Sequence, residues 1–259
     1  MKKEQYSLLA QPPKIFQIIK IGFSIWKHTF NKTIAFSLIN SAIMYLDIFF
    51  QYEKISPIYG HLFSIVSQII GFMMLISIVY SINKSVHNEN ISFNQAIKIS
   101  CKKILPLILL GILSLIVIIV GMILLVIPGI FCMISLAFSN FFVIVEENSV
   151  VNSMKKSFRL VSGNWWYTFG AILIISLISC IIVVSLMGLC FIVPTFFAFV
   201  KNYYEMQVDY HTTQIVFIMS LLGISMPLTM IFIYPWGIAS MLAIFYSLKA
   251  KNSVANVTK

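Results

Sequence analysis

Charge is scarce in this chain of 259 residues, because Asp, Glu, Lys and Arg together make up only 10% of it. A soluble domain of this length needs a larger charged fraction to stay in solution. Hydrophobic residues make up 59% of the sequence, and several apolar runs exceed the roughly 18 residues that mark a membrane-spanning helix. The runs do not alternate apolar and polar residues as β-barrel strands do. The composition therefore predicts an all-α polytopic membrane protein.

Motifs that carry enzyme chemistry are also missing. The sequence contains no His-Glu-x-x-His motif, no nucleophile elbow, no phosphate-binding loop and no cluster with metal-ligand spacing. Its 4 cysteines form no Cys-x-x-Cys pair, and we interpret them as small buried hydrophobic side chains. We therefore expect no enzymatic activity, no cofactor and no metal site. The whole chain, residues 1–259, is interpreted as a single integral membrane domain.

Six apolar segments are predicted to form transmembrane helices, and three amphipathic segments are predicted to form surface helices. Each amphipathic segment places basic residues on one face and apolar residues on the other, which is typical of helices at a membrane surface. The predicted spans cover about residues 33–51, 58–83, 105–127, 130–145, 165–189 and 214–248. The predicted surface helices cover about residues 14–28, 91–104 and 148–162.

Capping signals accompany two of the surface helices. A capping-box pattern begins at Ser92. Asn148 or Ser149 can cap the start of the third surface helix, and Gly163 its end. Residues 190–200 either extend the fifth span or fold back. The last span, at 35 residues, is too long for one straight crossing, so its two prolines are expected to kink or break it.

The order surface helix, span, span occurs three times along the chain. Ser24, Ser100 and Ser157 occupy similar places in the three surface helices. One interpretation is three parallel repeats of a single unit, an arrangement used by some transporters and also a simple way to build a bundle. The other interpretation is chance similarity between amphipathic helices.

A hairpin with a polar exit is the most distinctive part of the sequence. The apolar run over residues 122–127 turns at Pro128-Gly129 and a second run returns to residue 145. The acidic step Glu146-Glu147 follows and leads into the third surface helix. We expect the two acids to pair with cations of this helix or of another surface helix.

The residues from Met122 to Ile130, the acidic step, and the segment Ser153 to Leu160 resemble the YciC family of bacterial inner-membrane proteins. They are also similar to the membrane domain of some glycerophosphodiester phosphodiesterases. The resemblance implies a six-span bacterial inner-membrane protein, but no activity, because the family has none established. The phosphodiesterases keep their catalytic residues in a separate soluble domain. In this chain Ser139-Asn140-Phe141-Phe142 stands where relatives usually carry a proline.

The candidate functional residues fall into three groups. Asp47 and His61 lie at similar depths near the outer ends of the first two spans, where they are a possible polar pair or solvated interfacial residues. The structural motif around the hairpin consists of Pro128, Gly129, Glu146, Glu147, Ser157 and Gly163. The candidates for binding anionic lipid headgroups are Lys20, Lys27, Lys98, Lys102, Lys103, Lys155, Lys156 and Arg159.

These features favour a multi-pass protein without a catalytic site that supports the envelope and engages anionic lipids. The alternative is a small transporter or channel with a path between the helix repeats. The net charge of +10 would suggest nucleic acid in a soluble protein, but here the cations follow the membrane topology, and we expect no nucleic-acid partner. The sequence indicates neither a protein partner nor an oligomeric state.

Both chain termini are predicted to be cytoplasmic. Of the 18 Lys and Arg residues, all but Lys54 and Lys201 fall on one side of the six-span topology, and cytoplasmic loops carry the excess of basic residues. Reporter fusions after Ser56 and Val208 should therefore read periplasmic, and fusions after Glu89 and Lys259 cytoplasmic. A periplasmic carboxyl terminus would contradict this topology.

Overall fold

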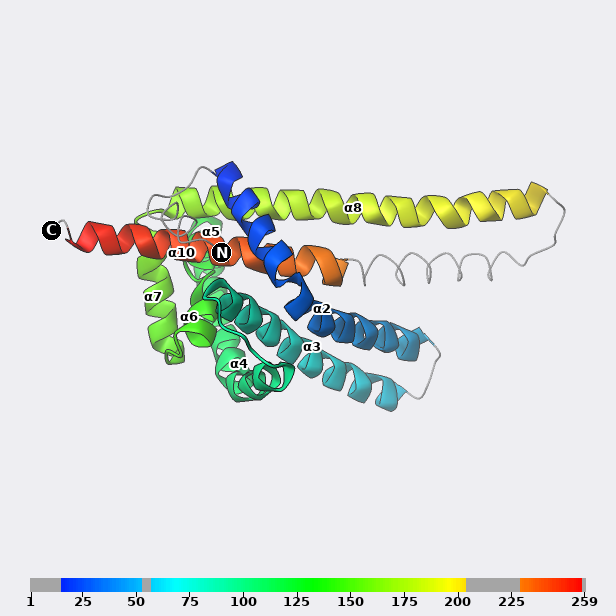
Figure 1. Ribbon diagram of the computed structural model, residues 1–259, viewed down its shortest axis with the longest axis horizontal. Coiled ribbons are helices and arrows are strands. Elements are labelled where there is room, and N and C mark those ends of the chain that lie inside the picture. The colour runs from blue at the N-terminus through cyan, green and yellow to red at the C-terminus, as the bar shows by residue number, and fades with distance from the viewer. Residues whose placement is uncertain (1–14, 53–56, 204–228, 258–259) are drawn as a thin grey trace.

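The computed structural model describes residues 15–52, 57–203 and 229–257, and every element in these ranges is a helix. Its helices are α2 (Ile15–Tyr52), α3 (Pro57–Val86), α4 (Phe93–Leu124), α5 (Val126–Ser135), α6 (Ser139–Val145), α7 (Val150–Ser162), α8 (Trp165–Tyr203), the π-helix η2 (Thr229–Ile233) and α10 (Tyr234–Val257). Figure 1 shows α3, α8, α10 and the carboxyl-terminal part of α2 extended along the molecule, with α7 across one end. The predicted all-α fold is confirmed for the described residues.

Five helical segments in the described ranges are long and apolar enough to cross a membrane. They are Ile58–Val86, Phe93–Leu124, Val126–Val145, Trp165–Gly188 and Ile231–Asn252. Only 17% of the most apolar part of Phe93–Leu124 is buried inside the protein, so most of its apolar side chains are available to lipid. These helices indicate a membrane protein. The predicted first span, residues 33–51, is not among the five.

Two predicted boundaries between a surface helix and a span are wrong. The segments 14–28 and 33–51 form one continuous helix, α2, and the segments 91–104 and 105–127 form α4. The sequence between them contains no glycine or proline that would end a helix, apart from Pro106, which the interior of α4 accommodates. A change of polarity alters the surroundings of a helix but does not interrupt its backbone hydrogen bonds.

A change of direction within α2 nevertheless separates two arms (Figure 1). Two threonine hydroxyls in α2 bond back to carbonyls one turn earlier: Thr29 Oγ1 donates to the Ile25 carbonyl at 2.9 Å, and Thr33 Oγ1 donates to the Thr29 carbonyl at 3.2 Å. Such bonds often bend helices. The amphipathic first arm and the apolar second arm can therefore take different directions without a loop.

The hairpin reverses at a single residue, Leu125, whose φ of −165° and ψ of 149° are extended. The sequence placed the turn at Pro128-Gly129, but Pro128 lies in the first turn of α5, where a missing N–H costs little. Gly129 serves a close approach of the two helices, because a Cβ there would lie 2.9 Å from the Met122 nitrogen. Its neighbour across the hairpin is Gly121.

The returning span is interrupted. We predicted one helix over residues 130–145, whereas α5 ends at Ser135 and α6 begins at Ser139. This break contains no proline or glycine. Its cause is therefore found in the packing around it, which includes α7.

The helices α8 and α10 show how residues 190–200 and the last predicted span are arranged. Residues 190–200 continue α8 through Pro194 to Tyr203, so they extend the fifth span. The last predicted span, residues 214–248, is described from Thr229. Pro227 lies outside the described residues, and Pro235 is the second residue of α10, which follows the π-helix η2. The helix α10 also continues beyond the predicted end of this span, residue 248, to Val257.

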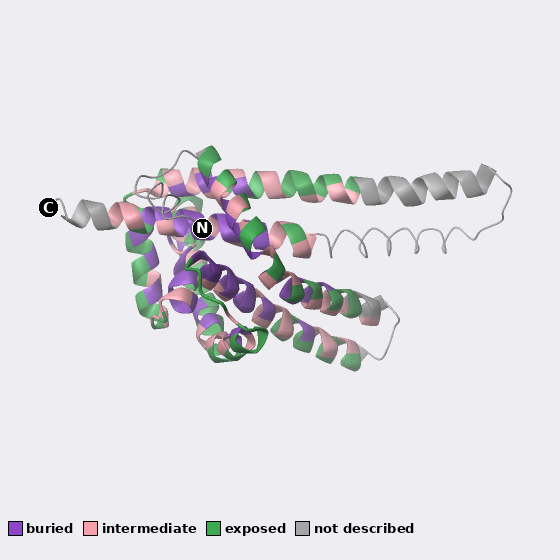
Figure 2. Cartoon of the chain, viewed as in Figure 1, coloured by how far each residue is buried: buried purple, intermediate pink, exposed green. Residues whose placement is uncertain are grey.

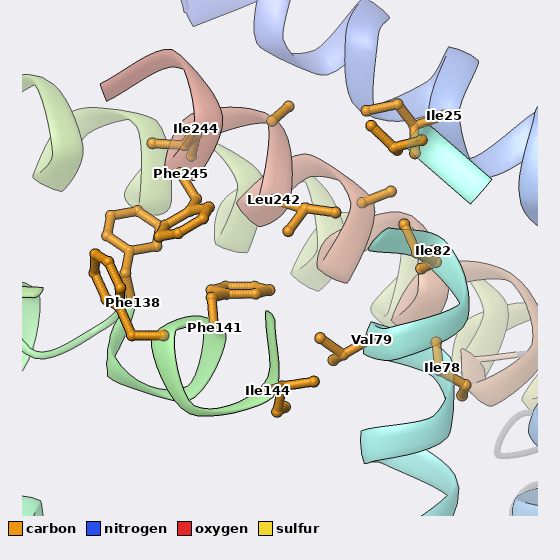
Figure 3. Packing of buried hydrophobic residues seen from close by; sticks show 14 of the residues in the cluster. Ile25, Ile78, Val79, Ile82, Phe138, Phe141, Ile144, Leu242, Ile244 and Phe245 are labelled. Carbon is orange, nitrogen blue, oxygen red and sulfur yellow. The ribbon is translucent and has the colours of Figure 1, made fainter. Parts of the chain in front are cut away.

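Buried residues gather where α10 meets α3 and α6, whereas the projecting helix ends are more exposed (Figure 2). Phe245 of α10 lies at the centre of an aromatic cluster. Its ring centroid is 6.1 Å from that of Phe138, 5.7 Å from that of Phe141 and 5.0 Å from that of Phe142 (Figure 3). Such aromatic pairs stabilise a fold beyond the area that they bury. This cluster attaches the short helix α6 to the rest of the bundle.

Three contacts between small residues join the basic segments to other helices. Gly22 of α2 lies against Ser240 of α10, because a Cβ at Gly22 would lie 2.9 Å from the Ser240 Cα. Ser100 of α4 lies 2.7 Å from Ser77 of α3, between their hydroxyl oxygens. Ser157 of α7 donates to the Ser135 carbonyl of α5 at 2.7 Å. In the first arm of α2 the small residue in such a contact is Gly22.

Replacing Gly22 with alanine should destabilise the protein by about 1–3 kcal/mol, because its methyl group would meet the backbone of α10. Gly111→Ala is the matched control, since a Cβ at Gly111 in α4 meets nothing within 4 Å. That control should be neutral or slightly stabilising. Thermal melting of the two variants in detergent measures the difference, and equal melting temperatures would contradict the close approach.

Candidate functional site

The helix α7 forms where the sequence predicted the third surface helix. It runs from Val150 to Ser162, with Ser149 at its N-cap and Gly163 at its C-cap. The capping box at Ser92 is also present, because the Ser92 and Gln95 side chains bond to each other's backbone N–H. The predicted capping residues thus mark the start of α4 and both ends of α7, although the Ser149 side chain makes no capping hydrogen bond.

The buried face of α7 differs from the predicted apolar stripe. Ser153, Ser157, Leu160 and Val161 are buried, whereas Val151 is 53% exposed and Phe158 is 43% exposed. Close packing against α5 and α6 favours small residues on the inner face. The outer face consequently presents apolar and basic side chains together.

Ser157 bridges the break between α5 and α6. Its hydroxyl donates to the carbonyl of Ser135, the last residue of α5, at 2.7 Å. The same hydroxyl accepts a hydrogen bond from the backbone N–H of Phe138, directly before α6, at 3.2 Å. Backbone groups inside a membrane need partners within the protein, and this side chain supplies one on each side of the break. The sequence marked Ser157 as part of a motif, but no local signal revealed this role.

Glu146 joins three elements at the end of α6. Its carboxylate accepts from Lys156 of α7 at 3.1 Å, from Lys249 of α10 at 2.6 Å, and from the Asn148 side chain at 3.1 Å. Glu147 lies 3.9 Å from Lys103 of α4. Both kinds of partner predicted for the acids are thus observed. The sequence did not predict the contribution of Lys249, which follows the last predicted span.

Two opposing effects act on Glu146. Partial burial raises the pKa of its carboxyl, but the hydrogen bonds and charges of Lys249 and Lys156 outweigh burial and hold the pKa below its usual value of 4.5. The carboxylate is therefore ionised at neutral pH and ties α6, α7 and α10 together.

Further polar contacts gather the basic ends of the helices in one region. Lys32 of α2 donates to Asn90, before α4, at 3.1 Å. Lys251 of α10 donates to Asn164, before α8. Together with the partners of Glu146 and Glu147, these contacts involve lysines of α2, α4, α7 and α10. At the opposite end of the molecule lie the carboxyl ends of α2 and α8 (Figure 1).

The structure divides the predicted headgroup-binding cations into two groups. Lys103 and Lys156 form ion pairs with acids. The others form no ion pair within the described residues. These six are Lys20, Lys27, Lys98, Lys102, Lys155 and Arg159. All six are exposed, so their charges are available to a ligand.

No ion pair joins Asp47 and His61, which both belong to the described residues. Asp47 accepts a hydrogen bond from Ser64 at 2.6 Å, and His61 is exposed near the start of α3. No three His, Cys, Asp or Glu side chains within the described ranges are placed to hold a metal ion. The described cysteines are free, and Cys101 and Cys180 are exposed, contrary to the burial that we expected.

A cavity of about 430 Å³ adjoins the break between α5 and α6. Residues of α3, α4, α6, α8, η2 and α10 line it, so it lies between the spans. Its walls are mostly apolar, and its polar side chains are Asn140, Ser179 and Tyr234. The break therefore opens onto a largely apolar space.

The five helices that are long and apolar enough to cross a bilayer indicate an α-helical membrane protein. The chain belongs to the Uncharacterised protein family UPF0259, whose family model matches residues 58–224, more than half of the chain. The matched region starts at α3 and includes the hairpin, α7 and α8. No curated protein and no solved structure matches the chain.

Ser157→Ala should destabilise the protein by about 1–3 kcal/mol, because a buried carbonyl and a buried N–H would lose their partner. Ser153→Ala is the matched control, since the buried Ser153 hydroxyl has no hydrogen-bond partner. This control should leave the free energy of unfolding unchanged or raise it slightly. Chemical or thermal unfolding in detergent distinguishes the two, and a larger loss in Ser153→Ala would contradict the bridging role.

The contribution of Glu146 should depend on pH. Because its pKa is lower in the folded protein, the stabilisation is present above the unfolded value near 4.5 and is lost as pH falls through the folded pKa. Glu146→Gln should therefore melt at a lower temperature than wild type at neutral pH, and the gap should narrow in acid. Melting curves from about pH 7 to pH 3 test this, with Glu147→Gln as the control. A gap that widens in acid would refute it.

Proposed function

We propose that this protein is a non-enzymatic multi-pass protein of the bacterial inner membrane that binds anionic lipid headgroups through three basic segments. The segments are the first arm of α2, the first turns of α4, and α7. The resemblance of the hairpin region to YciC-like proteins supports the bacterial inner membrane as its location. The uneven distribution of basic residues supports cytoplasmic termini.

The outer face of α7 is the observation that carries this proposal. Val151 and Phe158 are exposed beside Lys155 and Arg159, which have no ion-pair partner in the described chain. A helix that presents apolar and basic side chains together suits the boundary between headgroups and acyl chains. Each cation near an anionic surface contributes about 1 kcal/mol, screened by salt.

We further infer that the chain consists of three repeats, each a basic segment followed by two spans. The three contacts between small residues support this arrangement, because each joins a basic segment to the preceding unit, and the first unit to the last. The segment in α4 contacts α3, α7 contacts α5, and the first arm of α2 contacts α10. Each basic segment thus lies against the helix that ends the preceding unit, and the first segment closes the ring. This order would present all three basic segments to one leaflet.

The ion pairs of α7 provide a matched test. Lys155→Gln combined with Arg159→Gln removes two unpaired charges and should lower the retention of anionic lipid by about fivefold per cation at low salt. Lys156→Gln removes a charge that is paired with Glu146, so it should lower the melting temperature and keep the lipid preference. Native mass spectrometry with mixed phosphatidylglycerol and phosphatidylcholine, beside melting curves, measures both properties.

A transporter or channel is the second candidate function, and the cavity beside the broken helix is the observation that favours it. Transporters often place their substrate sites where a span is interrupted. The cavity holds few polar groups and no charged side chain among its lining residues, so it fits an apolar substrate better than an ion. An unchanged lipid preference in the double variant of α7 would favour this candidate over headgroup binding.

A further inference from the structure

A second cavity, of about 470 Å³, lies between the first arm of α2 and the pair α8 and α10. Figure 1 shows this arm crossing the two helices. Its walls are formed by Ile19 and Phe23 of α2, Ile182 of α8, Phe232 of η2 and Trp236 of α10. These walls are apolar, and the volume lies within the range of small-molecule sites. We call this cavity the α2 groove.

Lys20 and Trp26 of α2 both line the α2 groove. Lys20 is exposed and is its charged lining residue. It has no ion pair or hydrogen bond within the described chain. The Nε1 atom of Trp26 is buried and has no hydrogen-bond acceptor. A buried donor without an acceptor is costly, so an occupant that supplies an oxygen would remove this cost.

Aromatic contacts hold the Trp26 side chain in place. Its ring centroid is 5.3 Å from that of Phe23, 5.3 Å from that of Phe30 and 6.1 Å from that of Phe232. Phe232 belongs to the π-helix η2, and π-helical turns occur frequently at functional sites. The position of the unpaired donor is therefore fixed by its neighbours.

We propose that the α2 groove binds one molecule of an anionic phospholipid. Its phosphate contacts Lys20, a second lipid oxygen accepts from Trp26 Nε1, and an acyl chain lies against the apolar walls. The single cation matches a net negative headgroup, and the walls require an apolar chain, which a free phosphate lacks. The inference rests on the proposed lipid binding and narrows it to one site.

A pair of lysines on the same helix tests this site. The full-length protein is purified in detergent, mixed with equal amounts of phosphatidylglycerol and phosphatidylcholine, and examined by native mass spectrometry. Lys20→Gln should reduce the tightly bound phosphatidylglycerol by about fivefold. Lys27→Gln is the matched control, because Lys27 is also exposed and without an ion pair in the described chain, but it lies outside the groove. Because it removes only part of the general attraction of the first arm of α2 to anionic lipid, it should reduce the tightly bound phosphatidylglycerol less than Lys20→Gln does.

Filling the groove provides a second test that does not depend on charge. Ile182→Trp places a larger side chain on the wall formed by α8 and should reduce phosphatidylglycerol retention by a similar factor. A melting curve confirms that this variant is folded. The Trp26→Phe substitution keeps an aromatic ring, removes the N–H, and should weaken retention to a smaller extent.

The outcomes separate this site from general attraction to anionic lipid. Equal losses in Lys20→Gln and Lys27→Gln would overturn the groove site and leave the broader proposal intact, as would full retention in a folded Ile182→Trp. A selective loss in Lys20→Gln, with no effect of the double variant in α7, would support the groove and reject headgroup binding by α7.

Discussion

The backbone around the break between α5 and α6 requires hydrogen-bond partners, because lipid offers none. Ser157 supplies one to each side of the break, and so couples a basic surface helix to the interior of a span. Glu146 reinforces this coupling from the end of α6, where it binds lysines of α7 and α10. The aromatic cluster around Phe245 then fixes α6 against α10. The position of α7 is therefore determined by the packing of the bundle as well as by its own amphipathic sequence.

The cations of this protein serve two purposes that the sequence alone does not separate. Lys156 and Lys249 neutralise Glu146, and Lys103 lies near Glu147, so these charges stabilise the joins between helices. Lys155 and Arg159 flank Lys156 in α7 but are exposed without an acidic partner in the described residues. Only the fold decides which lysine faces an acid. This division suggests why a short helix carries three cations when one is sufficient for the ion pair.

The sequence predicted the helical class, the limits of α7, the cap at Ser92 and the partners of the two acids. These features depend on composition, on local hydrogen bonds and on charges close in the chain. The sequence did not predict the continuity of α2 and α4. An amphipathic pattern indicates which faces of a helix contact water or lipid, but it does not indicate where the helix ends. The reversal at Leu125 was misplaced because proline and glycine mark turns in general, whereas here they allow helix entry and close packing. The buried serine face of α7 depends on the break in a distant helix, which no local pattern reveals.

The length of α8 has a consequence for the membrane that surrounds it. Its 39 residues measure about 58 Å along the axis at 1.5 Å per residue. Even at a tilt of 40°, near the limit for spanning helices, it would extend about 44 Å along the bilayer normal. The hydrocarbon core is only about 30 Å thick, so tilting alone does not remove the mismatch. The helix α8 is therefore longer than one crossing of the hydrocarbon core requires, even when it is tilted.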